Sequence, residues 1–127
     1  MSESIRTPLG KVRGLGSAKK GVEHFIAQRA TAVALLILTP WILISLIGAV
    51  RGGYDGAIAW IGEPINAALI LVTIGAGVHH MRIGLQVVIE DYISKTSSKL
   101  SLLILNTFIS VLVFVAAAVA VLKLAIA

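Results

Sequence analysis

Residues 30–50 read ATAVALLILTPWILISLIGAV, an almost continuously apolar stretch. A membrane-spanning helix needs about 20 predominantly apolar residues to cross the hydrocarbon core. Two further stretches of comparable length follow in the second half of the chain. The sequence therefore predicts an all-α integral membrane protein, a single domain over residues 1–127, with transmembrane helices at about 26–50, 64–93 and 100–126.

The overall composition agrees with a membrane protein. Apolar residues make up 57% and charged residues 13% of the chain, against about 25% charged residues in soluble domains. The absence of cysteine excludes disulfides, thiolate zinc sites and iron–sulfur ligation by this chain. Basic residues are not interleaved with aromatic ones, so we predict contact with membrane lipid and no nucleic-acid partner. Sequence signatures of soluble enzymes are missing as well.

The distribution of basic residues predicts the orientation. Residues 1–22 are Gly-rich and basic, and we expect an extended cytoplasmic tail there. Eight basic residues lie in this tail, at the start of the first span or in the loop at 94–99: Arg6, Lys11, Arg13, Lys19, Lys20, Arg29, Lys95 and Lys99. The opposite side has two, Arg51 and Lys123. The positive-inside rule then places the N-terminus in the cytoplasm and the C-terminus in the periplasm; in a mitochondrion the matrix replaces the cytoplasm.

The second span contains the run HHMRIGLQVVIEDY at residues 79–92. Ionisable groups are costly inside a membrane, so this run is a candidate functional site. Helical geometry puts His80 on one stripe with Gly77 and Gly84, which leave space on either side of the imidazole. A flat macrocycle with an iron atom would fit such a groove and take an imidazole nitrogen as ligand. Alternatively, the glycines allow close helix packing and His80 makes an interhelical hydrogen bond.

Other polar residues have open roles. His79 points about 100° away from His80, and we favour a polar contact with a neighbouring helix. Arg82 lies nearly opposite His80 and could bind a haem propionate, pair with a partner carboxylate or extend to the interface. Arg29 could hold a propionate or a phospholipid, or extend to the interface in the same way. Asp91 and Tyr92 lie at the end of the span, where they could serve a quinone or simply belong to the interface.

Two segments give the chain a resemblance to a known family. One is Gly21-Val22-Glu23-His24-Phe25 followed by Arg29-Ala30-Thr31-Ala32; the other is His80, Gly84, Gln86-Val87-Val88 and Asp91-Tyr92. The chain resembles the D-type hydrophobic membrane-anchor subunits of succinate dehydrogenase, in which a His precedes the Tyr of an Asp-Tyr pair by twelve residues. His80 meets this spacing and His79 does not. The tail from Arg6-Thr7-Pro8-Leu9-Gly10 through Gly14-Leu15-Gly16 is similar to the alphaproteobacterial and mitochondrial-type branch.

The resemblance implies a set of roles. His80 would be one axial ligand of a haem b shared with a companion cytochrome b anchor subunit, and Arg29 would lie near a propionate. Tyr92, with Asp91 beside it, would bind ubiquinone. The other partners would be an iron–sulfur subunit and a flavoprotein subunit, in the bacterial inner membrane or the mitochondrial inner membrane. The chain itself would be a non-catalytic subunit of a succinate:quinone oxidoreductase, which links the tricarboxylic acid cycle to the respiratory chain.

Two other interpretations stay open, and a third is disfavoured. The chain could be a structural or transport-accessory membrane protein in which His79, His80 and Arg82 make helix contacts or a proton path. It could be the companion anchor, although that family usually has an Arg-His pair after the glycine, where this chain has Leu85-Gln86-Val87. A cytochrome using both histidines of this chain is disfavoured, because adjacent histidines on a helix cannot ligate one iron from both faces.

Overall fold

The computed structural model describes residues 7–14 and 20–126, and these form helices only. The elements are α1 (Pro8–Val12), α2 (Lys20–Val50), α3 (Gly53–Gly62), α4 (Pro64–Tyr92) and α5 (Thr96–Ile126). Three of them, α2, α4 and α5, are long and apolar enough to cross a membrane. The prediction of an all-helical chain with three spanning helices is therefore confirmed.

The structure differs from the expected extended tail. Residues 8–12 form a short helix, because Pro8 suits the first helical turn and the Thr7 hydroxyl accepts a hydrogen bond from the Gly10 amide at 3.1 Å. The helix of the first span begins at Lys20 rather than near residue 26. Residues 1–6 and 15–19, which belong to the same predicted tail, lie outside the described residues.

The connection between the first two spans contains a helix of its own, α3. Gly53 has a φ of +72°, which a glycine adopts without strain, and it starts the helix α3 instead of continuing a loop. A Cβ at Gly56 would lie 2.7 Å from the carbonyl oxygen of Ala49, so glycine allows α3 to fold back closely on α2. Trp60 of α3 packs against Trp41 of α2, with 5.9 Å between ring centroids.

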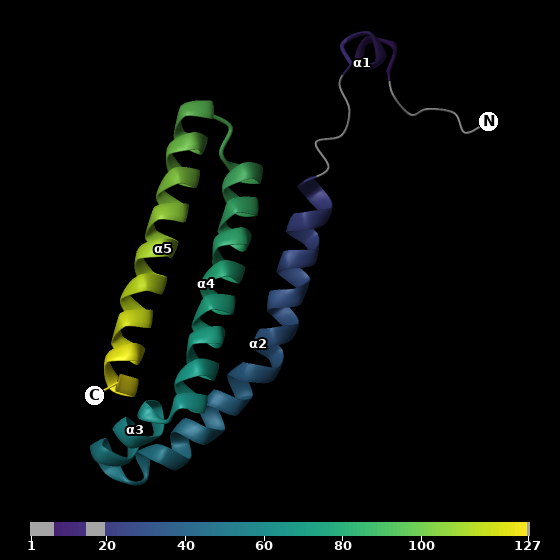
Figure 1. Ribbon diagram of the computed structural model, residues 1–127. Helices are drawn as coiled ribbons and strands as arrows, with labels where there is room; N and C mark the ends of the chain where they lie inside the picture. Colours follow the sequence, from purple (N-terminus) through teal and green to yellow (C-terminus); the bar gives the residue numbers. More distant parts are fainter. Residues whose placement is uncertain (1–6, 15–19, 127) are drawn as a thin grey trace, which may run out of the picture.

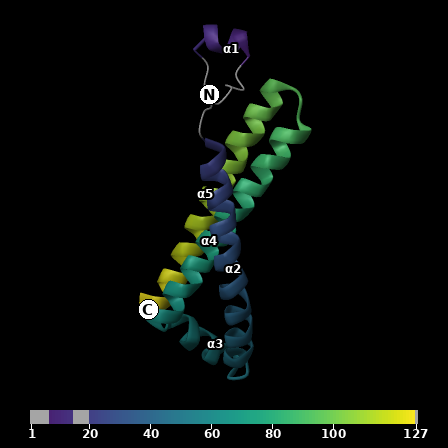
Figure 2. The ribbon, with the colours of Figure 1, turned by 90° about the vertical axis from the view of Figure 1, so that its right-hand side faces the viewer.

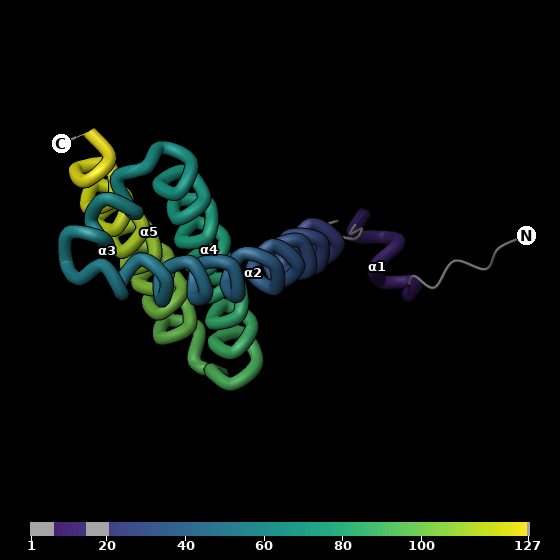
Figure 3. The backbone as a smooth tube through the Cα atoms, turned by 90° about the horizontal axis from the view of Figure 1, so that it is seen from below, coloured from purple at the N-terminus to yellow at the C-terminus, as the bar shows by residue number. Residues whose placement is uncertain are grey.

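The long helices form a single row with α4 in the middle (Figure 1). α4 contacts both α2 and α5, and α3 lies at the end where α2 turns back. The helix α2 continues through Pro40 and bends toward α3 in its second half. It crosses the α4–α5 pair at an angle (Figure 2), and its N-terminal half projects away from that pair (Figure 3).

A row of three helices buries little. Among the described residues only Ala67, Ile83 and Val121 are buried apolar side chains, and Ser110 is the buried polar one. Large apolar side chains are exposed along all three spanning helices. In a membrane such surfaces meet lipid or other apolar helices, so the row does not need a large core of its own.

Candidate functional site

The site centres on a contact between α2 and α4. Oγ1 of Thr31 lies 3.0 Å from Nδ1 of His80, and both side chains are half-buried. The same hydroxyl donates to the carbonyl of Ala27 at 2.8 Å, with the carbonyl of Gln28 at 3.1 Å. A threonine in a helix commonly makes this bond to the carbonyl four residues earlier. The His80 imidazole is thus held by one nitrogen against the first span.

His80 lines a cavity of about 360 Å³ together with four residues of α2: Phe25, Gln28, Arg29 and Ala32. The guanidinium of Arg29 stands 5.2 Å from the centre of the Phe25 ring, a cation–π contact that holds it on the helix surface. The structure therefore brings the predicted residues His80 and Arg29 to one cavity. An imidazole and a guanidinium on one cavity can bind a metal centre and an anionic group at the same time.

The two glycines that flank His80 have different surroundings. A Cβ at Gly77 would lie 3.8 Å from Cδ2 of Leu35, an ordinary contact with α2. A Cβ at Gly84 would meet no atom within 4 Å. Gly77 therefore faces the neighbouring helix, whereas Gly84, about one helical turn after His80, has open space where a side chain would lie. A groove on both sides of the His80 imidazole stays a prediction.

Asp91 and Tyr92 are not part of this cavity. Both side chains are exposed, Tyr92 to 82%, at the last two positions of α4. Eleven or twelve residues separate them from His80, or roughly 16–18 Å at 1.5 Å per residue. They form a second location near the α4–α5 turn, where Nζ of Lys99 donates to the carbonyl of Glu90 at 2.8 Å.

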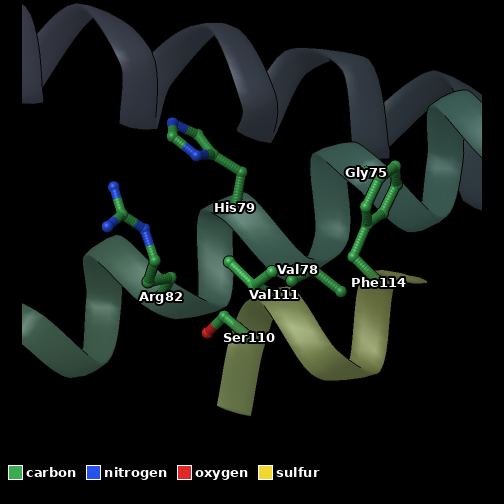
Figure 4. A pocket seen from close by; sticks show the side chains of 7 residues that line it. All are labelled: Gly75, Val78, His79, Arg82, Ser110, Val111 and Phe114. Carbon is green, nitrogen blue, oxygen red and sulfur yellow. The ribbon is translucent and has the colours of Figure 1, made fainter. Parts of the chain in front are cut away.

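His79 and Arg82 belong to different surroundings from His80. They line a cavity of about 240 Å³ between α4 and α5 (Figure 4), and a smaller one with Glu23, His24 and Ala27 of α2. Figure 4 shows the His79 ring directed toward the α2 ribbon. The Arg82 guanidinium lies 3.4 Å from Oγ1 of Thr107, so it reaches α5. These positions agree with contacts between helices.

Sequence reasoning left the partner of the His80 imidazole unidentified, and the structure shows that it is Thr31. The sequence does contain a hydroxyl near the start of one span and a histidine in the middle of the next. Because 49 residues separate them, the sequence alone does not indicate that they are in contact. The Phe25–Arg29 pair was also missed, although its spacing of four residues is a recognisable helical pair. Among the described residues no group of three or more His, Cys, Asp or Glu could hold a metal ion.

Comparison with known proteins agrees with the resemblance. The family described as "Succinate dehydrogenase/Fumarate reductase transmembrane subunit" matches residues 3–122. A protein of Rickettsia bellii, named succinate dehydrogenase hydrophobic membrane anchor subunit, is 34% identical over 95% of this chain and 97% of its own length. The protein of that name from Paracoccus denitrificans is 31% identical over 76% of this chain and 75% of its own.

Other matches point the same way. A Rickettsia conorii protein, also named succinate dehydrogenase hydrophobic membrane anchor subunit, is 28% identical over 94% of this chain and 96% of its own length. No solved structure gives a significant match. The resemblance inferred from the two sequence segments, including its alphaproteobacterial character, is confirmed. The chain belongs to the family of succinate dehydrogenase and fumarate reductase transmembrane subunits, on the branch of the hydrophobic membrane anchors.

Proposed function

We propose that this chain anchors a succinate dehydrogenase in its membrane and contributes one ligand to a haem b and part of a ubiquinone site. Succinate is oxidised on a flavoprotein subunit, and electrons reach ubiquinone through an iron–sulfur subunit. The chain itself is non-catalytic in this scheme. Its family and its relatives' names support the anchor role, and the cavity shared by His80 and Arg29 supports the haem site.

The arrangement around His80 carries the proposal, because the residues present fit a haem. Nδ1 is occupied by Thr31, and within residues 7–14 and 20–126 no hydrogen-bond partner is found for Nε2. Nε2 is therefore the nitrogen that can ligate iron, while Arg29 on the same cavity can neutralise a propionate. When bound, haem supplies one-electron exchange. His80 would hold the haem from this chain, and we infer that a histidine of the companion cytochrome b anchor subunit would be the other ligand.

The exposed end of α4 supports the quinone site. The Tyr92 phenol can donate a hydrogen bond to a ubiquinone carbonyl, and the Asp91 carboxylate can pass protons from water to the reduced ring. Both groups are available on this chain because neither is buried by its own helices. We infer that the companion anchor and the iron–sulfur subunit cover the rest of the quinone.

The charge pattern supports an orientation, in the proposed inner membrane, with the quinone end at the cytoplasmic or matrix side. The N-terminal end of α2 and the α4–α5 turn lie at the same end of the helix row (Figure 1). That end has Arg29, Lys95 and Lys99, so the basic residues are on the predicted inner side. The exposed apolar faces of the row then contact the companion anchor and membrane lipid.

A reduced-minus-oxidised optical spectrum of the purified complex tests the haem assignment. We expect a b-type spectrum that His80→Ala abolishes or strongly alters and that His79→Ala largely preserves. His79 is the matched control, since it is the same residue type one position away but lines other cavities. An unaltered haem spectrum in His80→Ala would remove His80 as a ligand. Purification of the complex without a flavoprotein would contradict the anchor role and favour a structural or accessory membrane protein.

A further inference from the structure

The interaction between Thr31 and His80 has a direction that its geometry determines. A hydroxyl has one hydrogen to donate and two lone pairs that accept. The Thr31 hydrogen is taken by the carbonyls of Ala27 and Gln28, at 2.8 and 3.1 Å. Oγ1 can therefore only accept from the imidazole. Nδ1 of His80 must carry a hydrogen, which leaves the lone pair of a neutral ring on Nε2.

From this geometry we propose that Thr31 is a positioning residue for the haem, because it selects the Nδ1–H tautomer of His80 and fixes the ring orientation. The inference rests on the proposed haem function and names the residue that prepares its ligand. Histidines that bind metals usually donate their other N–H to an acceptor, which fixes the tautomer and increases the basicity of the ligand. Here the acceptor is a neutral hydroxyl on the neighbouring helix.

The position of Thr31 adds a second effect. Thr31 lies one helical turn, or three positions, from Gln28 and two from Arg29, on the stretch of α2 that lines the His80 cavity. The bond to Thr31 therefore links His80, the proposed haem ligand, to α2. The same helix has Arg29, the proposed partner of a haem propionate. Any displacement of α2 relative to α4 would change both contacts together.

The test compares variants of the whole complex. Thr31→Val keeps the β-branched shape and removes the acceptor, Thr31→Ala removes it without added bulk, and Thr31→Ser keeps the hydroxyl. Thr73→Val is the matched control, since Thr73 of α4 makes the same kind of bond, to the carbonyl of Leu69 at 2.7 Å, with no histidine attached. Haem content, the electron paramagnetic resonance signal and the haem midpoint potential are measured for each.

We expect Thr31→Val and Thr31→Ala to weaken haem affinity about 10- to 100-fold, the usual effect of losing a group that orients a metal ligand. The remaining haem should have a more positive midpoint potential and a changed resonance signal, because His80 becomes a weaker electron donor. Thr31→Ser should be close to wild type, and Thr73→Val should leave the haem unchanged.

The outcomes separate the two claims. Wild-type haem content, signal and potential in both Thr31→Val and Thr31→Ala would overturn the role of Thr31, even if His80→Ala destroys the haem. An unaffected haem in His80→Ala would instead overturn the haem ligation on which the inference rests. If Thr31→Val does not assemble while Thr73→Val does, the comparison of Thr31→Ala with Thr31→Ser decides the question. Equal loss of haem in Thr31→Ser and Thr31→Ala would contradict a role of the hydroxyl.

Discussion

Asn106 of α5 donates a hydrogen bond from Nδ2 to the backbone carbonyl of Arg82 in α4, at 2.9 Å. This bond joins two spanning helices at a half-buried position, beside the buried Ser110. Polar bonds of this kind within membranes stabilise helix association by about 0.6 kcal/mol on average. The bond is independent of the Arg82 side chain, which reaches Thr107.

Replacement of Asn106 by leucine should weaken the α4–α5 contact. We expect a destabilisation of about 0.6 to 1.7 kcal/mol, the range known for hydrogen bonds between membrane helices. The loss is measured as a lower melting temperature of the detergent-solubilised complex. Thr107→Val is the control and should have a smaller effect, because its contact with Arg82 is long, at 3.4 Å. Equal stability of Asn106→Leu and wild type would show that the bond contributes nothing to assembly.

Gly84→Leu should prevent haem binding without unfolding the chain. Apart from the adjoining backbone of α4, no atom lies within 4 Å of a Cβ at this position, so a side chain would not clash within this chain. Gly84 lies about one helical turn after His80, so the added side chain would compete with the proposed haem for space. Gly48→Leu is a matched control, since Gly48 on α2 also has nothing within 4 Å but is remote from His80 in the sequence. Haem content per complex is measured. Normal haem content in Gly84→Leu would argue against a cofactor on this side of the imidazole.

Arg29→Gln should weaken haem retention, because the amide cannot neutralise a propionate. Hydrogen bonds to charged groups contribute about 1.5 kcal/mol or more, which corresponds to roughly tenfold in haem affinity. Arg29→Lys should recover part of the loss, and Arg51→Gln, at the opposite end of α2, should have no effect. Titration of haem loss from the complex gives the measurement. If Arg51→Gln and Arg29→Gln behave alike, the effect is one of membrane charge and not of a propionate contact.

Tyr92→Phe should impair quinone reduction while succinate oxidation with an artificial dye continues. Loss of one hydrogen bond of about 1 kcal/mol predicts a reduction in quinone-dependent kcat/KM of several-fold. Tyr54→Phe is the matched control: Tyr54 is 79% exposed and Tyr92 is 82% exposed, but Tyr54 lies in α3 at the other end of the helix row. Unchanged quinone kinetics in Tyr92→Phe would remove Tyr92 from the site.

The predicted orientation can be tested with reporter fusions. An alkaline phosphatase domain inserted after Gly53 should be active, because this segment lies on the predicted periplasmic side with few basic residues. The same domain inserted in the loop at 94–99 should be inactive. The reverse pattern would invert the topology and move Tyr92 away from the cytoplasmic surface.

The sequence by itself determined the class of the protein and the positions of its spans. Apolar stretches of more than 20 residues are typical of membrane-spanning helices, so all three long helices could be predicted from the sequence. The predicted bounds of α4 agree within one residue, whereas α2 and α5 begin earlier than predicted. Local turn chemistry was harder to predict. Thr7 and Pro8 start a short helix in the tail, and Gly53 starts α3, because capping and a positive φ depend on details of one or two residues.

The tertiary structure decided what each polar residue of the second span faces. Helical periodicity separated His80 from His79 and placed two glycines near His80, but it could not tell which glycine faces a helix and which faces open space. That depends on the rotation and crossing of α2 against α4, which set Leu35 beside Gly77 and Thr31 beside His80. Contacts between residues 49 positions apart are made by packing, and no local pattern encodes them.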